Sequence, residues 1–237
     1  MTTKQDAIKI LGLYFLVMLS TIGVQFLLVP LFESQLEEQA FAITFNTGLN
    51  LLIYLVLTIG FAYFFRHIFR FDFQLSKEDI SETVKYVAIG FGVMILFVIA
   101  ASLIYQYFGI TETSANQASL DVMFENGRTI DWIFLGIFTI FLAPIVEEFV
   151  FRKAIIGFFS RSLLSTTIAI IFSGLAFGYI HVASAADYEQ IIYYALIGMV
   201  LALFYVLSKY NIYVPILMHL IFNGFLVSMM FVQLAAV

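Results

Sequence analysis

The sequence predicts an all-α, polytopic integral membrane protein, a helical bundle of about seven transmembrane helices (six to eight). Hydrophobic residues make up 62% of the chain and charged residues only 11%, whereas soluble domains have about 45–50% and about 25%. The apolar residues form runs of about 20, the length that a helix needs to cross the hydrocarbon core. Short alternating segments, which are typical of membrane β-barrels, are not found.

Seven segments are predicted to span the membrane: 8–31, 41–65, 86–108, 132–158, 163–182, 190–208 and 212–235. The first is interpreted as a retained helix and not a signal peptide, because its apolar run is too long and the acidic segment 33–39 follows it. We divide the chain into N-terminal transmembrane helices (1–110) and a candidate catalytic core (130–226), both within one compact membrane domain.

The distribution of positive charge predicts the orientation. With a cytoplasmic N-terminus, ten of the eleven Lys and Arg residues fall on the cytoplasmic side and only Arg128 falls outside, which follows the positive-inside rule. Segment 71–85 is expected to form the main cytoplasmic loop, partly as an amphipathic interfacial helix. Segment 109–131 is expected to be the longest external loop.

Two function classes are excluded by composition. The chain has no cysteine, so disulfides, thiolate nucleophiles and Cys-based zinc sites are absent. A net charge of −5 argues against a nucleic-acid partner, since such proteins carry a basic patch. The expected partner is the lipid bilayer, and the sequence predicts no oligomeric state.

Two adjacent glutamates, Glu147 and Glu148, lie in the otherwise apolar stretch FLAPIVEEFVFRK. Each charge costs about 2.5–3.5 kcal/mol at mid-membrane, so the pair contributes no stability there. Glu148 and Arg152 are four residues apart on one helix face and are predicted to form a salt bridge. Glu147 points elsewhere and has no local cation, while Pro144 is expected to disturb the helix one turn earlier. The alternative is a solvated pair at the cytoplasmic helix end.

The three histidines help to decide between these interpretations. His67 lies near a membrane exit and is interpreted as interfacial. His181 ends the apolar run FSGLAFGYIH, and His219 lies within VPILMHLIFNGF with Asn223 one turn later. Because apolar helices rarely carry an imidazole without a partner, we expect these groups to meet the glutamates at one site. A purely structural role for both histidines is the alternative.

Three short motifs occur in order on three hydrophobic segments. EEFVFR fits Glu-Glu-x-x-x-Arg, FGYIH fits Phe-x-x-x-His, and HLIFN fits His-x-x-x-Asn. Together they resemble the CAAX prenyl protease and bacteriocin-processing (CPBP, or Abi) family of intramembrane proteases, in a prokaryotic form. The resemblance covers about residues 130–226.

The resemblance implies an intramembrane endopeptidase that hydrolyses a peptide bond of a membrane-associated peptide or protein, with a role in bacteriocin processing or self-immunity. It also implies the site residues. The positions that match the family's catalytic residues are Glu147, Glu148, His181, His219 and Asn223. Arg152 and Phe177 match supporting positions, and a packing role is expected for the aromatic ring.

Two mechanisms fit these residues. In the first, Glu147 and His181 remove a proton from water. His219 and Asn223 then donate hydrogen bonds to the oxyanion. In the second, His181, His219 and Glu147 hold a divalent metal such as zinc, which lowers the pKa of its bound water to about 7. Direct activation is slightly favoured.

Other chemistries remain as alternatives. Ser173 shares a helix with His181 and could serve as a nucleophile, but the glutamates would then be unexplained. Ser173, Gly174 and Gly178 are more simply small residues for close helix packing. A non-enzymatic immunity protein or an ion-coupled transporter could also use buried Glu and His, although the internal repeat typical of transporters is not found.

Overall fold

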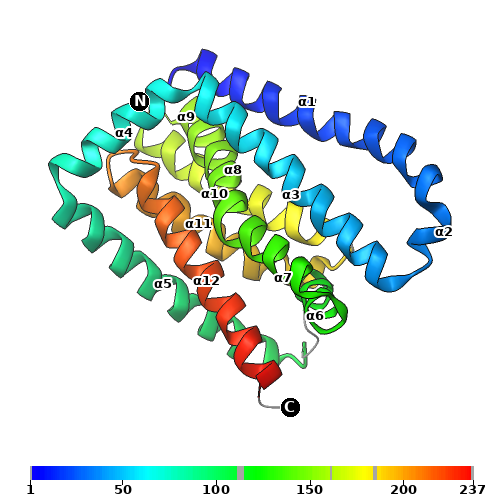
Figure 1. Cartoon of the computed structure of the whole chain (residues 1–237). Helices are drawn as coiled ribbons and strands as arrows, with labels where there is room; N and C mark the ends of the chain where they lie inside the picture. Colours follow the sequence, from blue (N-terminus) through cyan, green and yellow to red (C-terminus); the bar gives the residue numbers. More distant parts are fainter. Residues whose placement is uncertain (1, 111–114, 161, 184–185, 236–237) are drawn as a thin grey trace.

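The computed structural model describes residues 2–110, 115–160, 162–183 and 186–235, which form an all-helical bundle without strands (Figure 1). Seven helical stretches are long and apolar enough to cross a membrane: Lys4–Leu36, Gln39–Phe64, Ile80–Tyr107, Thr129–Phe159, Leu163–Val182, Tyr188–Leu207 and Tyr213–Val232. The predicted fold class is therefore confirmed, and each predicted span coincides with one of these stretches.

The N-terminal part begins with the long helix α1, whose first turn is capped by Thr3. The Thr3 hydroxyl oxygen accepts a hydrogen bond from the Asp6 N–H at 3.0 Å, which satisfies a backbone donor at the helix start. The elements of this part are α1 (Lys4–Leu28), η1 (Val29–Phe32), α2 (Glu33–Leu36), α3 (Gln39–Phe64), α4 (Arg66–Glu78) and α5 (Ile80–Tyr107).

The C-terminal part holds one long helix that enters the π-helical hydrogen-bond register twice. Its segments are α7 (Thr129–Gly136), the π-helix η2 (Ile137–Leu142), α8 (Ala143–Glu148), the π-helix η3 (Phe149–Ile156) and α9 (Gly157–Phe159). The other elements are α6 (Ala115–Asn126), α10 (Leu163–Val182), η5 (Tyr188–Gln190), α11 (Ile191–Leu207) and α12 (Tyr213–Ala235). In Figure 1 the N-terminus, α4 and α9 lie at one end of the bundle, and α2, α6 and the C-terminus lie at the other.

Both predicted loops are largely helical. Segment 71–85 is divided between α4 and α5, with only Asp79 between them, and the Asp79 carboxylate caps α5 by accepting from the Glu82 N–H at 3.0 Å. The expected external loop 109–131 contains α6 and the start of α7; its residues 111–114 lie outside the described part. A helix within 71–85 was expected and is present, whereas the helices within 109–131 were not predicted, because that segment is too polar to show a long apolar run.

The amphipathic helix α4 is anchored to the core by a buried ion pair. Asp72 of α4 pairs with Lys153 of η3, and both side chains are almost completely buried. Asp72 also accepts a hydrogen bond from the Ile212 N–H at 2.8 Å, while Lys153 donates to the Tyr210 carbonyl at 2.9 Å. Lys153 is therefore a structural residue and not a solvated charge at the membrane surface.

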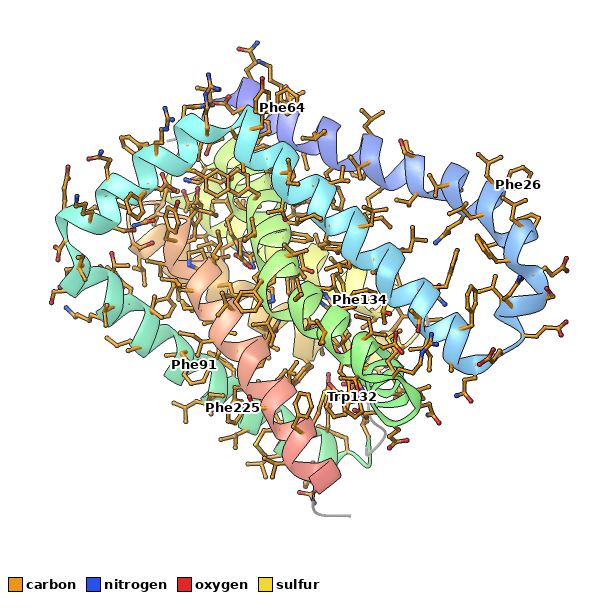
Figure 2. The ribbon with its side chains drawn as sticks, viewed as in Figure 1. Phe26, Phe64, Phe91, Trp132, Phe134 and Phe225 are labelled. Carbon is orange, nitrogen blue, oxygen red and sulfur yellow. The ribbon has the colours of Figure 1, made fainter. Side chains whose placement is uncertain are left out.

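The outer surface is apolar, as expected for a protein that faces lipid. Phe26 is 81% exposed, and Figure 2 shows Phe26 and Phe64 projecting outward from α1 and α3. Phe91 of α5 and Phe225 of α12 instead face each other, with ring centroids 6.4 Å apart. Charged residues buried inside and aromatic residues exposed outside are the pattern of a protein that lies in a bilayer.

Small residues bring α10 and α11 into close contact, as their positions predicted. A Cβ atom added to Gly178 of α10 would lie 2.7 Å from the Ile191 carbonyl oxygen and 2.9 Å from the Ala195 backbone nitrogen. Both atoms belong to the α11 backbone, which cannot move as a flexible side chain can. The glycine is therefore required for this helix spacing.

Replacing Gly178 by Ala is expected to destabilise the protein by about 1–3 kcal/mol, because overpacking forces the two backbones apart. The matched control is Gly92→Ala in α5, where an added Cβ would meet no atom within 4 Å. That change should be neutral or stabilise by up to about 1 kcal/mol through helix propensity. Thermal unfolding in detergent measures both, and equal midpoints would contradict the prediction.

Candidate active site

Glu148 lies at the centre of a buried polar network that joins α8 to α12. Its Oε2 accepts a hydrogen bond from Arg152 Nε at 2.7 Å, and its Oε1 accepts from His219 Nδ1 at 3.0 Å. The Glu148 and Arg152 side chains are 0% exposed, which confirms the predicted salt bridge. Since an unpaired buried charge is strongly destabilising, Glu148 both neutralises the arginine and orients the histidine.

The same network continues from Arg152 to α10. Arg152 Nη1 donates to Ser173 Oγ at 2.7 Å, and Ser173 Oγ donates to the Phe151 carbonyl at 3.0 Å. The hydroxyl group of Ser173 is completely buried and occupied by these two bonds. This geometry argues against a serine nucleophile and gives Ser173 a positioning role.

Phe177 lies between the two histidines. Its ring centroid is 4.4 Å from that of His181 and 5.8 Å from that of His219, and the Arg152 guanidinium lies 5.6 Å from the Phe177 ring. The expected packing role of this aromatic ring is confirmed. It separates the imidazoles and covers the arginine at the same time.

Both imidazoles are held through Nδ1. His181 Nδ1 lies 2.8 Å from the Phe177 carbonyl oxygen, and His219 Nδ1 lies 3.0 Å from Glu148 Oε1. A carbonyl or carboxylate oxygen can only accept, so each Nδ1 donates. In the neutral ring the other nitrogen, Nε2, is then an acceptor. The His181 ring is further fixed by stacking on Tyr194, with centroids 4.7 Å apart.

The surroundings of the Glu147 side chain differ from those of Glu148. Its side chain is partly accessible, with the residue 9% exposed, and its Oε2 has no hydrogen-bond partner among the described residues. The nearest ring nitrogen is His219 Nε2, at 3.9 Å. Glu147 lines a cavity of about 910 Å³, together with His181, His219 and Asn223. The carboxylate is thus placed to accept a hydrogen bond from a water molecule beside two imidazoles.

Asn223 is held by a backbone carbonyl that Pro144 leaves without a partner. The Ala143 N–H bonds to the Phe138 carbonyl, five residues back, so the helix has the π register here. In that register the Thr139 carbonyl would accept from residue 144, but proline has no N–H. Asn223 Nδ2 of α12 donates to the Thr139 carbonyl instead, at 2.8 Å. One N–H of the Asn223 amide is therefore committed, and the second can reach a ligand.

The variant Asn223→Ala is expected to lose about 1 kcal/mol of stability, because the partly buried Thr139 carbonyl would lose its donor. Adding Pro144→Ala supplies an N–H to that carbonyl and should restore most of the loss. Unfolding midpoints of the single and double variants measure this. No recovery in the double variant would contradict the proposed link between Pro144 and Asn223.

The candidate metal ligands His181, His219 and Glu147 meet only part of what a metal site requires. The Nδ1 bonds of both histidines leave Nε2 free, an orientation that is also typical of metal-binding histidines. However, the described residues contain no group of three or more His, Cys, Asp or Glu side chains placed to hold an ion. In this arrangement the described side chains do not form a complete metal site.

The further residues of the site differ in how far the sequence could reveal them. Ser173 could have been found, because it precedes Phe177 and His181 at intervals of four on one helix face. Thr139 acts through its backbone carbonyl, so its side-chain type says nothing about the role. Tyr194 lies in an apolar run with an adjacent tyrosine, and only the fold selects the one that stacks on histidine.

Comparison with known proteins gives three findings. A family model described as Type II CAAX prenyl endopeptidase Rce1-like matches residues 129–225. The chain is 33% identical over 163 residues to the "Putative membrane peptidase YdiL" of Bacillus subtilis (strain 168), covering 65% of this chain and 59% of that protein. It is 29% identical over 153 residues to the "Membrane-embedded CAAX protease MroQ" of Staphylococcus aureus (strain USA300), covering 64% and 60% respectively.

The chain thus spans about three fifths of the length of these curated relatives. No solved structure shows significant similarity to it. The matched family region contains all three motifs and every side chain of the network around Glu148.

Proposed function

Because the chain belongs to the CPBP family as a prokaryotic, multi-pass integral membrane member, we propose that it is an intramembrane endopeptidase. It would hydrolyse a peptide bond of a membrane-associated peptide or protein. One observation carries the proposal: Glu147, whose buried Oε2 has no hydrogen-bond partner among the described residues, lines a cavity that two oriented imidazoles share.

Hydrolysis would begin with a water molecule bound between Glu147 and His181. Glu147 takes a proton from the water as general base while the oxygen attacks the peptide carbonyl carbon. His181 accepts a hydrogen bond from the same water through Nε2, because its Nδ1 is engaged with the Phe177 carbonyl. The separate environments of the two glutamates support this assignment, since Glu148 has both oxygens occupied.

The tetrahedral intermediate would be stabilised by His219 and Asn223. Protonated His219 can donate from Nε2, and Glu148 balances the charge of that form through Nδ1. Asn223 can donate its second N–H, with the amide held in place by the Thr139 carbonyl. Hydrogen-bond donors of this kind typically contribute about 2.7–4 kcal/mol each. When the C–N bond breaks, Glu147 returns its proton to the leaving amine.

Chelation distinguishes direct water activation from the metal mechanism. Direct activation predicts that purified protein treated with a strong chelator keeps its peptidase rate and contains no stoichiometric zinc by elemental analysis. A zinc mechanism would require His181, His219 and Glu147 to move together. Loss of the rate on chelation and its return with zinc would establish that mechanism.

Termini of membrane proteins provide the direct test of peptidase activity. Cells with the wild-type protein should contain new N- and C-terminal peptides that are missing from cells with His181→Ala at equal protein level. Unchanged termini with a retained cellular phenotype would instead support a non-enzymatic immunity protein, and proton-coupled flux lost in the variant would support a transporter. Sensitivity of the same strains to bacteriocins tests a role in bacteriocin processing or self-immunity.

A further inference from the structure

The cavity has a buried inner end and an exposed outer end. At the inner end Glu147 and His219 are 9% and 4% exposed. At the outer end Ser102, Leu103 and Gln106, near the C-terminal end of α5, line the same cavity and are exposed. Helix α6 contributes further lining residues there. The cavity therefore extends from the centre of the bundle toward the end where α6 and the C-terminus lie (Figure 1).

That end is opposite to the positively charged end of the bundle. The described cations at the α4 end are Lys4, Lys9, Arg66, Arg70, Lys77, Lys85 and Lys209. Arg152 and Lys153 do not count toward orientation, because both are buried in ion pairs. Arg128 is the one described cation at the α6 end. The positive-inside rule therefore places the outer end of the cavity on the extracytoplasmic side.

The lining of the cavity disfavours charged ligand groups. Among the described lining residues, Glu147 and the two histidines are the only ones with an acidic or basic side chain. Much of the remaining wall is aliphatic or aromatic, as with Val98 on α5 and Phe222 on α12. Because burying a charge without a partner is costly, this wall fits uncharged, apolar side chains.

Two elements at the outer end of the cavity, α6 and η5, carry exposed acidic residues. Glu125 at the end of α6 and Glu189 in η5 are both exposed. The Tyr105 hydroxyl lines the cavity and donates to the Glu189 carbonyl at 3.0 Å, which places Glu189 beside the opening. Negative charge around an opening attracts cationic ligands and raises their local concentration.

We propose that the cavity receives, from the extracytoplasmic side, an uncharged apolar peptide segment that is flanked by basic residues. This inference rests on the proposed peptidase function for the fate of the segment. It adds the side of access and the chemical class of the substrate. The apolar segment would lie along α5 and α12 to reach Glu147, while its basic flank would stay at the acidic opening.

The side of access can be tested without any peptidase activity. The chain has no cysteine, so Gln106→Cys at the opening and Lys77→Cys on α4 each supply a single thiol. A membrane-impermeant maleimide added to intact cells is expected to label the first variant, and the second only after permeabilisation. The reverse result would overturn the inference and leave the proposed hydrolysis untouched.

The substrate class can be tested by protection of the same thiol in purified protein. Three synthetic peptides of equal length are compared: an apolar segment flanked by lysines, the same segment flanked by glutamates, and a lysine-flanked segment with a central aspartate. The lysine-flanked apolar peptide should slow labelling of Gln106→Cys at a concentration roughly three- to tenfold lower than the others. Equal protection by all three would overturn the proposed class.

Charge-removing variants test whether the acidic residues at the opening cause the preference for lysine-flanked peptides. Combined Glu125→Gln and Glu189→Gln should remove the preference for lysine flanks, and raised salt should weaken it in the Gln106→Cys protein, since exposed charges are screened. The matched control is Glu37→Gln, an exposed carboxylate beside α2. A preference that persists in the double variant would contradict the role of the opening.

Discussion

The variant Glu147→Gln is expected to lose about 10²–10⁴-fold of the peptide-cleavage rate and to keep the unfolding temperature of the wild type. The amide has the shape of the carboxylate but cannot take a proton from water. Stability should not change, because Glu147 Oε2 has no hydrogen-bond partner among the described residues. Cleavage in proteoliposomes and thermal unfolding in detergent measure the two effects separately.

The control for Glu147→Gln is Glu37→Gln, which removes one exposed carboxylate. It should change neither the cleavage rate nor the unfolding temperature. Wild-type cleavage by Glu147→Gln would exclude this residue as the general base. A large fall in its unfolding temperature would show that the residue is structural, contrary to the geometry of the site.

Replacing Arg152 by Met is expected to destabilise the protein by about 3–5 kcal/mol, because Glu148 would keep its buried charge without its cation. The change also removes the hydrogen bond to Ser173, which ties η3 to α10. Replacing Glu148 by Leu at the same time should recover part of the stability, since no unpaired charge remains, but not the orientation of His219. Unfolding midpoints of both variants give the comparison.

An exposed ion pair on α5 provides the matched control for the Arg152→Met variant. Lys85 and Glu82 are 3.0 Å apart and three residues apart on α5, with both side chains largely exposed. Lys85→Met should leave the unfolding midpoint close to that of the wild type, because exposed ion pairs contribute little to stability. An equally small effect for Arg152→Met would contradict the central role of the buried pair.

Helical spacing made the local part of the site predictable. Glu148 and Arg152 lie on one face because they are four residues apart, and the structure has that salt bridge at 2.7 Å. The same rule could have added Ser173 to Phe177 and His181. The two polar segments 71–85 and 109–131 were harder, because neither has an apolar run that would identify its helices.

Contacts between distant residues could not be predicted in the same way. Asp72 and Lys153 are separated by 81 residues, and each appeared to be an ordinary charge near the membrane surface. The motif predicts that Asn223 donates a hydrogen bond to the oxyanion, but it does not predict that one of its N–H groups binds the Thr139 carbonyl. That bond depends on a local π register and on the absence of an N–H at Pro144, which the motif does not reveal.

The sequence by itself indicated an integral membrane protein with about seven membrane-spanning helices, since hydrocarbon length and the free energy of burying charge act on each segment separately. It also indicated which polar groups belong to the site, because ionisable residues in apolar helices are costly and usually functional. Only the tertiary structure decided how these groups divide their roles. Arg152 binds one oxygen of Glu148, and packing of α8 against α12 brings His219 to the other, whereas Glu147 lines the cavity. Two adjacent identical residues cannot express this difference in sequence.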